Sequence, residues 1–211
     1  MLTINDISKT FDFKTVIKGV NLSLSKGEII HLIGDNGSGK TTLLKIIAGV
    51  LKPESGEANI FDKNILGNDS DFKKDIIYWG HQPMLYPSMT TIENLDFFLK
   101  LRLQRIPQNI DSILEKVGLQ DYKNSPCYKY SRGMFQRFNL LRLMTSDWKL
   151  ALMDEPLSGL DSKGVNLLLK EMGNWKNKEK YMINSYHESE ALNKICTSVY
   201  KLNNHQLSKE L

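Results

Sequence analysis

A glycine-rich segment that ends in lysine carries the strongest chemical signal in the sequence. Residues 34–41 read Gly-Asp-Asn-Gly-Ser-Gly-Lys-Thr and fit the pattern G-x-x-x-x-G-K-[ST]. Glycines leave backbone N–H groups free to surround a phosphate, and a helix that begins at this point adds the positive end of its dipole. The segment predicts a nucleotide site made by Gly34, Asp35, Asn36, Gly37, Ser38, Gly39, Lys40, Thr41 and Thr42.

Two side chains of this segment have defined chemical tasks. The ammonium of Lys40 is a compact cation for the β- and γ-phosphates, which also makes it a candidate catalytic residue. The hydroxyl of Thr41 is a ligand for Mg²⁺. ATP and Mg²⁺ are therefore the expected cofactors.

A pair of carboxylates ends an apolar segment later in the chain. Asp154 and Glu155 follow Leu-Ala-Leu-Met. Behind a phosphate loop, Asp154 is placed to hold Mg²⁺, and Glu155 is the candidate general base for the attacking water. Without such a loop, the pair would read as solvated surface carboxylates.

The elements that position these residues can be read from the apolar pattern. Residues 28–33 predict a buried strand, and residues 40–51 predict a helix that Pro53 ends. Later strands are expected at Leu150–Met153, Tyr181–Ile183 and Val199–Leu202. One face of the first helix is predicted to hold Leu43, Leu44, Ile47 and Leu51.

The middle of the chain, residues 83–148, reads as helical. Thr90 and Glu93 have the spacing of a capping box, and Gly118 stands where a second helix would end. Strands on both sides of a helical middle predict an α/β core, 1–82 and 149–211, with an inserted helical part. The apolar face of the first of these helices is expected to hold Ile92, Leu95, Leu99 and Leu103. That of the second is expected to hold Ile113, Leu114 and Val117.

Composition excludes several other classes. The 211 residues carry a net charge of +4 without a block of basic residues, so no nucleic-acid partner is expected. Cys127 and Cys196 stand apart and indicate neither a zinc site nor a disulfide. Because no apolar run has the length of a membrane span, a transport function would need a second chain as the pore. His31, inside an apolar strand, reads as structural.

Further segments, in order, make the chain resemble the ABC ATPases. Residues 130–137 resemble the family signature LSGGQ-x-Q-R in a YSRGM form, and Ser158–Asp161 resembles its D-loop. His187 resembles the switch histidine. The signature, with Asp154 following Ser131 by 23 residues, is specific to this family, whereas many enzymes share the phosphate loop.

The resemblance implies a P-loop core with a mostly parallel sheet, an antiparallel β arm and a helical subdomain. It implies that Ser131, Arg132, Gly133 and Met134 act on the ATP held by a second copy, in a head-to-tail homodimer. Asp161 belongs to the D-loop, and His187 contacts the γ-phosphate. Phe11 takes the place of the aromatic residue that stacks on adenine. Phe11 could instead pack ordinarily in a sheet, and Phe13 would then take the stacking role.

The chain departs from the family pattern in two places. Arg132 replaces the first signature glycine and Met134 replaces glutamine, whereas the serine and the second glycine are kept. The Q-loop position falls on His81 or on its neighbour Gln82, and either could reach Mg²⁺ or the attacking water. Both readings stay open.

Residues 80–95 resemble the branch of the family that exports haem for cytochrome c biogenesis. This implies a motor on the cytoplasmic side of the inner membrane, attached to a membrane-spanning subunit. The alternative is an ABC-2-type exporter of a drug, lipid or polysaccharide. A non-transport ABC ATPase is disfavoured because the chain has no room for long coiled coils. A nucleotide kinase is disfavoured because the sequence lacks an arginine-rich lid, and a non-catalytic regulator because Glu155 is present.

Overall fold

The computed structural model describes residues 1–61, 63–65, 71–81, 84–187 and 189–211. They form two compact units. The first unit contains residues 1–79, 149–156 and 172–211, and the second contains residues 80–148 and 157–171. The sequence-based division placed residues 157–171 with the core, whereas in the structure they cluster with the helical unit.

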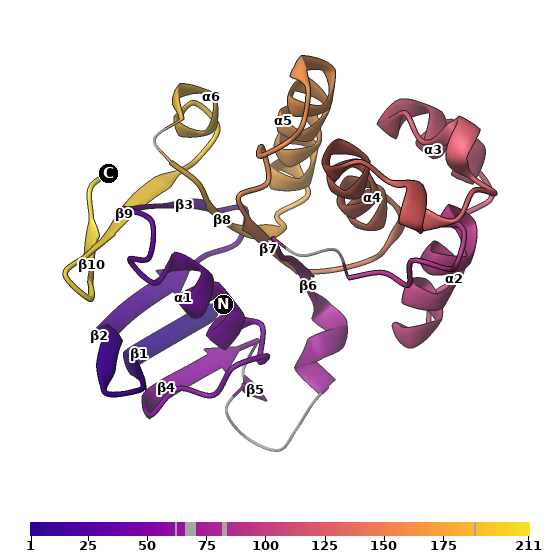
Figure 1. The fold of residues 1–211 in the computed structure, drawn as a ribbon. Coiled ribbons are helices and arrows are strands. Elements are labelled where there is room, and N and C mark those ends of the chain that lie inside the picture. Colours follow the sequence, from indigo (N-terminus) through magenta and orange to yellow (C-terminus); the bar gives the residue numbers. More distant parts are fainter. Residues whose placement is uncertain (62, 66–70, 82–83, 188) are drawn as a thin grey trace. The chain divides into compact units, whose positions relative to one another are not determined.

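A six-stranded sheet forms the centre of the first unit (Figure 1). Its order is β10-β9-β3-β8-β7-β6, in which β10 pairs antiparallel and the other neighbours pair parallel. The central strands are buried throughout because both faces of the sheet are covered. The strands are β3 (Ile29–Ile33), β6 (Ile76–Trp79), β7 (Leu150–Asp154), β8 (Tyr181–Ser185), β9 (Ser198–Asn203) and β10 (Gln206–Lys209).

A second, antiparallel sheet belongs to the same unit. Its order is β2-β1-β4-β5, with bounds Leu2–Phe11 for β1, Lys14–Leu24 for β2, Ser55–Ile60 for β4 and Lys63–Asn64 for β5. The expected combination of a mostly parallel core and an antiparallel arm is confirmed.

Helix α1 (Lys40–Ile47) packs between the two sheets, and its apolar side chains join a core shared by strands of both. It ends earlier than the predicted limit at Leu51. Gly49 follows the C-cap with φ of +66°, a conformation that ends helices and that residues with a Cβ rarely adopt. The glycine, rather than Pro53, therefore terminates the helix.

Three helices build most of the second unit: α2 (Thr91–Leu101), α3 (Ile110–Val117) and α4 (Arg132–Thr145). The predicted capping box of α2 is confirmed, because the Thr90 side chain accepts from the Glu93 backbone and the Glu93 side chain accepts from Thr90. Gly118 caps α3 in the left-handed conformation, also as predicted. The predicted place of Leu103 in the apolar stripe is wrong, since it lies beyond α2 and is 95% exposed.

The remaining elements are short, except for one. Helix α5 (Ser162–Asn177) begins in the second unit and ends in the first. Helix α6 (Glu190–Asn193) lies in the first unit, and 3₁₀ turns occupy Asp71–Asp75, Gln120–Tyr122 and Cys127–Lys129. Among the described residues, no helix combines the length and apolar character that a membrane span requires.

Candidate nucleotide site

The phosphate loop leaves the carboxyl end of β3 and leads directly into α1. Lys40 is the first residue of that helix, and its ammonium donates to the carbonyl oxygens of Gly34 at 2.6 Å and Asp35 at 2.9 Å. An ammonium has three donors, so one remains for a further acceptor. The lysine is held across the loop by these two bonds, and its third donor is available to an anion.

The loop has room and donors for an anion. A Cβ at Gly37, where φ is +80°, would meet nothing within 4 Å. The hydroxyl oxygen of Ser38 is buried and has no hydrogen-bond partner among the described residues. Buried polar atoms are normally paired, so an orphaned hydroxyl here fits a ligand that supplies the partner. The half-buried Thr42 lies in the first turn of α1.

Three carboxylates act on Lys40. Burial lowers the pKa of Lys40, and the negative charges of Glu155, Asp154 and Asp35, in that order, offset part of the shift. A triphosphate would add further negative charge to this cluster. A divalent cation that entered with the nucleotide would relieve the repulsion, which is why the local charge fits a metal–nucleotide complex better than a free nucleotide.

Asp154 is held by two hydroxyl groups. Thr41 Oγ1 donates to its Oδ2 at 2.8 Å, and Ser185 Oγ donates to its Oδ1 at 2.5 Å. The carboxylate is 2% exposed, so these hydrogen bonds compensate for the loss of hydration. Asp154 and Thr41 together offer the hard oxygen ligands that Mg²⁺ prefers.

Glu155 follows at the end of β7 with an unusual backbone. Its φ is +51°, and its N–H donates to the carbonyl oxygen of Ser185 at 2.9 Å. A non-glycine residue in the left-handed region is uncommon and is found at functional sites. Ser185 therefore fixes both acidic residues, one through its side chain and one through its backbone.

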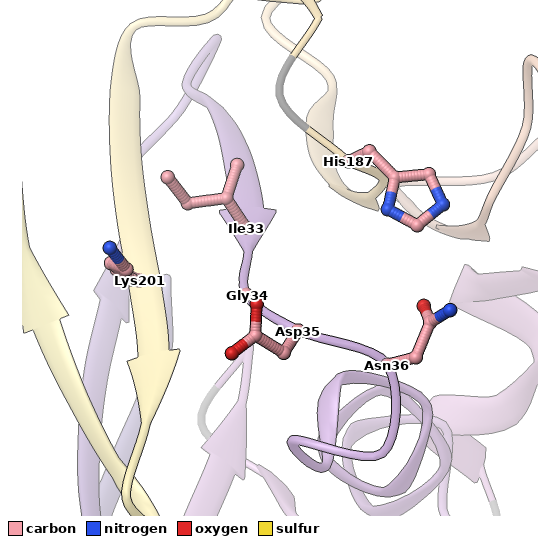
Figure 2. Close-up of a pocket in the computed structure, with 6 residues that line it drawn as sticks. All are labelled: Ile33, Gly34, Asp35, Asn36, His187 and Lys201. Atoms are coloured by element: carbon pink, nitrogen blue, oxygen red, sulfur yellow. The ribbon is translucent and has the colours of Figure 1, made fainter.

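A cavity of about 330 Å³ lies beside the loop. It is lined by Ile33, Gly34, Asp35, Asn36, His187 and Lys201. In Figure 2 the His187 ring and the Asn36 side chain lie on one side of Gly34, and Lys201 lies on the other. The predicted residues Gly34–Thr42, Asp154, Glu155 and His187 thus belong to one unit, and four of them, Gly34, Asp35, Asn36 and His187, line its cavity.

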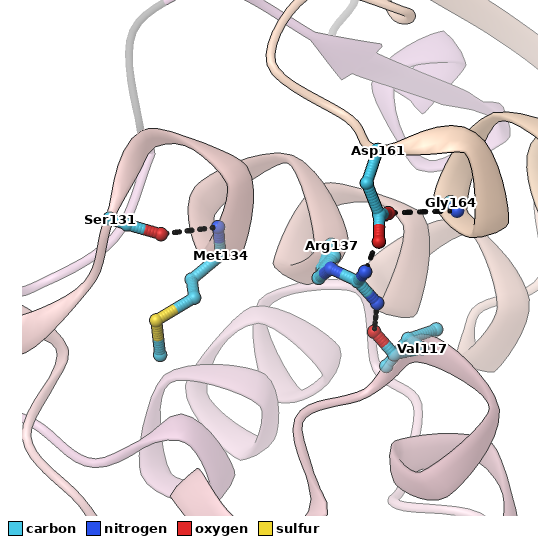
Figure 3. A network of polar contacts seen from close by, with 6 residues as sticks. All are labelled: Val117, Ser131, Met134, Arg137, Asp161 and Gly164. Atoms are coloured by element: carbon cyan, nitrogen blue, oxygen red, sulfur yellow. Dashed lines mark hydrogen bonds and ion pairs between the residues drawn. The ribbon is translucent and has the colours of Figure 1, made fainter.

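The signature residues form the start of α4 in the second unit (Figure 3). Ser131 is the N-cap, and its hydroxyl accepts from the N–H of Met134 at 3.3 Å. Gly133 is required by a close approach, since a Cβ there would lie 2.9 Å from the carbonyl oxygen of Gly159. Arg132, the departure from the family pattern, donates to the Ser158 hydroxyl at 2.7 Å. The signature thus contacts the D-loop segment of its own unit.

Asp161 is tied to the same helix. Arg137 donates to Asp161 Oδ1 and to the carbonyl oxygen of Val117, both at 2.7 Å (Figure 3). The same Asp161 oxygen accepts from the N–H of Gly164 at 3.0 Å, so it also caps the start of α5.

The other predicted site residues lie at the surface or outside the described residues. Phe11 ends β1 at 43% exposure with the Lys9 ammonium 5.2 Å from its ring centre, and Phe13 is fully exposed in the following turn. His81 is exposed and belongs to the second unit. Gln82 lies outside the described residues.

Sequence reasoning missed Ser185, Lys201 and the partner of His31. Ser185 and Asn184 are polar residues at the end of an apolar strand, and that position beside β7 was the available signal. Lys201 carried no signal in the sequence, because only the pairing of β9 with β3 brings it to the cavity.

The comparisons with known proteins agree with this geometry. Residues 17–158 match the family model described as "ABC transporter". The chain is 32% identical over 207 residues to the ABC transporter ATP-binding protein NatA of Bacillus subtilis, covering 94% of this chain and 84% of NatA. It is 34% identical to the cytochrome c biogenesis ATP-binding export protein CcmA of Yersinia pestis, covering 80% of this chain and 78% of CcmA. It is 37% identical to the taurine import ATP-binding protein TauB of Pelagibacter ubique, covering 89% of this chain and 71% of TauB.

Solved structures show the same fold. An ATP-binding subunit of an ABC transporter superposes with a TM-score of 0.89 at 25% identity, covering 99% of this chain and 89% of that one. The ATP-binding cassette MJ0796, solved as a dimer with ADP and Pi, superposes with a TM-score of 0.84 at 24% identity, covering 99% and 98%. With the phosphate loop, the acidic pair and these relatives in place, the chain belongs to the ABC transporter ATP-binding family, and it is an ATPase.

Proposed function

We propose that this ATPase powers transport through a separate membrane-spanning subunit, with catalysis carried by Lys40, Glu155 and His187. The observation that carries the proposal is the arrangement at the strand ends. Asp154 is held by Thr41 and Ser185, and its charge and that of Glu155 both act on Lys40. This arrangement supports the proposal that an oxygen ligand set, a base and a phosphate-binding cation surround one loop.

Each side chain has a separate task in this proposal. The free donor of Lys40 binds the β- and γ-phosphates, and Thr41 and Asp154 hold Mg²⁺, which neutralises the triphosphate when it is bound. Glu155 accepts the proton of the attacking water. His187 contacts the γ-phosphate across the cavity that it shares with Asn36, and Phe11 stacks on the adenine.

The second ligand set is supplied by another copy of the chain. Ser131 and the free N–H groups at the start of α4 form an anion-binding end, as helix N-termini do. We propose that this end, with Arg132, Gly133, Met134 and the D-loop residue Asp161, closes on ATP held by the partner. The dimeric state of MJ0796 supports this assembly.

For the substrate we propose haem exported for cytochrome c biogenesis, because CcmA is a relative and residues 80–95 resemble that branch. The motor would then lie on the cytoplasmic side of the cell membrane. An ABC-2-type exporter of another substrate is the alternative, and relatives such as TauB serve other cargoes. Deleting the gene should abolish covalent haem attachment to c-type cytochromes; normal attachment would favour the alternative.

The catalytic proposal is tested by Glu155→Gln. The variant removes the proton acceptor and leaves the phosphate loop intact, so ATP binding should persist while turnover falls by at least about 100-fold. Binding is measured by calorimetry and turnover by phosphate release. Glu115→Gln, at an exposed site on α3, is the matched control and should behave as wild type. A Glu155→Gln variant with normal turnover would remove Glu155 from the mechanism.

A further inference from the structure

A buried polar pair links β3 and β8. His31 and Asn184 face each other in the parallel register, and both are fully buried. His31 Nδ1 lies 2.7 Å from Asn184 Oδ1. Because Asn184 Nδ2 donates to the carbonyl oxygen of Ile30 at 3.2 Å, Oδ1 is the acceptor and Nδ1 of the histidine carries the proton.

The pair lies where two functional segments leave the sheet. After His31, β3 continues for two residues and passes into Gly34 and the phosphate loop. After Asn184, β8 ends at Ser185, and the chain reaches His187 two residues later. The N–H of Tyr186 still donates to the carbonyl oxygen of Leu32 at 3.2 Å, so the ladder holds the chain up to the residue before His187.

Asn184 also reaches the far side of the segment that carries His187. Its Nδ2 lies 3.6 Å from Cys196 Sγ, just after helix α6. The amide therefore contacts β3 directly and contacts the chain beyond α6 through the thiol. One side chain thus anchors this segment of the first unit at both of its ends.

Stability alone does not account for the pair. Replacing two buried hydrogen-bonded partners by apolar groups of similar shape is commonly neutral or stabilising. Backbone bonds of a parallel ladder are evenly spaced and do not by themselves select one register. A matched polar pair does select it, because a shift of one strand by one residue would put the two side chains on opposite faces of the sheet.

We propose that His31 and Asn184 are positioning residues that set the stagger between the phosphate loop and His187. This inference rests on the proposed catalytic role of His187. The pair touches no nucleotide and acts through the backbone of the two strands. Its effect is to hold the His187 ring over the cavity beside Asn36, the arrangement seen in Figure 2.

The environment of His31 supports this role. Burial lowers the pKa of His31, and hydrogen bonding to the Asn184 side chain and then to the backbone of His187 and of Asn184 offsets part of the shift. His31 Nε2 has no partner of ordinary geometry among the described residues. The bond to Asn184 is therefore the contact that holds the ring.

The test compares ATP turnover in two backgrounds. His31→Leu/Asn184→Val replaces the pair with apolar side chains, so that neither member of the pair is left buried without the other. We expect an unchanged urea midpoint, a KM for ATP within about twofold of wild type and a kcat lower by about 10- to 100-fold. His31→Gln, which keeps an amide donor, should recover most of the rate. If the double variant fails to fold, Asn184→Thr replaces the amide by a shorter hydroxyl, and the same loss of kcat with a KM for ATP close to wild type is expected.

A double-mutant cycle with His187→Ala separates the two proposals. If the pair acts through His187, adding the double substitution to His187→Ala should lower kcat no further. The positioning role would be overturned if the losses of kcat from the double substitution and from His187→Ala add up. It would also be overturned if His187→Ala is impaired while the chain without the pair keeps a normal kcat. A normal kcat for His187→Ala would instead overturn the catalytic role of His187. Ser198→Ala, which removes a hydrogen bond to Glu28 at the opposite end of these strands, is the control and should keep the wild-type kcat.

Discussion

At the scale of single residues, Ser185 holds both acidic residues of the site, Asp154 by its side chain and Glu155 by its backbone. Its hydroxyl donates to Asp154, and its carbonyl oxygen accepts the N–H of Glu155. The two carboxylates therefore have different environments although they are adjacent in sequence. Asp154 is buried and paired with hydroxyls, which suits a metal ligand, whereas Glu155 is partly exposed and has a left-handed backbone.

The histidine in β3 predicts a pH dependence of stability. Because burial lowers the pKa of His31 in the folded chain, the unfolded chain binds more protons below the ordinary pKa of about 6.5. The free energy of unfolding should be level above that pH and fall below it, by at most about 1.4 kcal/mol per pH unit for this one group. Urea unfolding at pH 7.5 and 5.5 measures the difference.

The control for this effect is His31→Leu/Asn184→Val, which lacks the titrating group. Cys196, the titratable neighbour of the pair, stays neutral in this range because burial raises its pKa to about 11. The wild-type chain should therefore lose more stability than the variant on acidification. Equal losses would show that His31 is protonated as easily in the folded chain as in the unfolded one.

Residues with a local pattern could be predicted from the sequence, and residues defined by pairing could not. Lys40 and Thr41 follow glycines in a fixed spacing, and in the structure Thr41 donates a hydrogen bond to Asp154. His31 reads as a structural residue because its partner lies 153 residues away. Nothing near His31 in sequence indicates that Asn184 will stand opposite it.

At the scale of elements, Asp161 joins two helices of the second unit. It caps the first turn of α5 and accepts from Arg137 of α4, which in turn holds the end of α3 through Val117. The cap is local, whereas the ion pair connects elements. The two contributions can be separated by substitution.

We predict that Asp161→Ala lowers the free energy of unfolding by about 1–2 kcal/mol, because the N-cap bond to Gly164 is lost. Asp161→Asn keeps an oxygen that can accept this bond and loses only a half-exposed ion pair, so it should cost less than about 1 kcal/mol. Denaturant unfolding followed by tryptophan fluorescence measures both. Equal losses in the two variants would assign the effect to the ion pair rather than to the cap.

Element boundaries show where sequence patterns stop being informative. The periodic leucines of α1 continue to Leu51, yet the helix ends before Gly49 because that glycine adopts a left-handed backbone. Leu103 continues the spacing of α2 but lies beyond its last turn. In both cases the periodic pattern extends past a stop that only backbone conformation reveals.

At the scale of the whole molecule, the proposed chemistry is divided between the two units. The first unit holds the phosphate loop, the acidic pair and His187, and the second holds the signature and Asp161. Helix α5 is common to both units, since it begins directly after Asp161 in the second unit and ends in the first unit. A chain with this division is complete as a motor only if a signature reaches a phosphate loop, and we propose that a second copy supplies it.

This proposal predicts a nucleotide-dependent dimer. Glu155→Gln should bind ATP without hydrolysing it, so Mg²⁺ and ATP should convert the variant from monomer to dimer, as light scattering after size exclusion would show. Adding Ser131→Tyr should prevent dimer formation, because a bulky ring would stand where the phosphate must approach the N-terminus of α4. ATP binding should persist in that variant, since its own Lys40 is intact. A dimer that forms without nucleotide, or that survives Ser131→Tyr, would mean that the two copies meet through another surface and that the signature does not cap the partner's ATP.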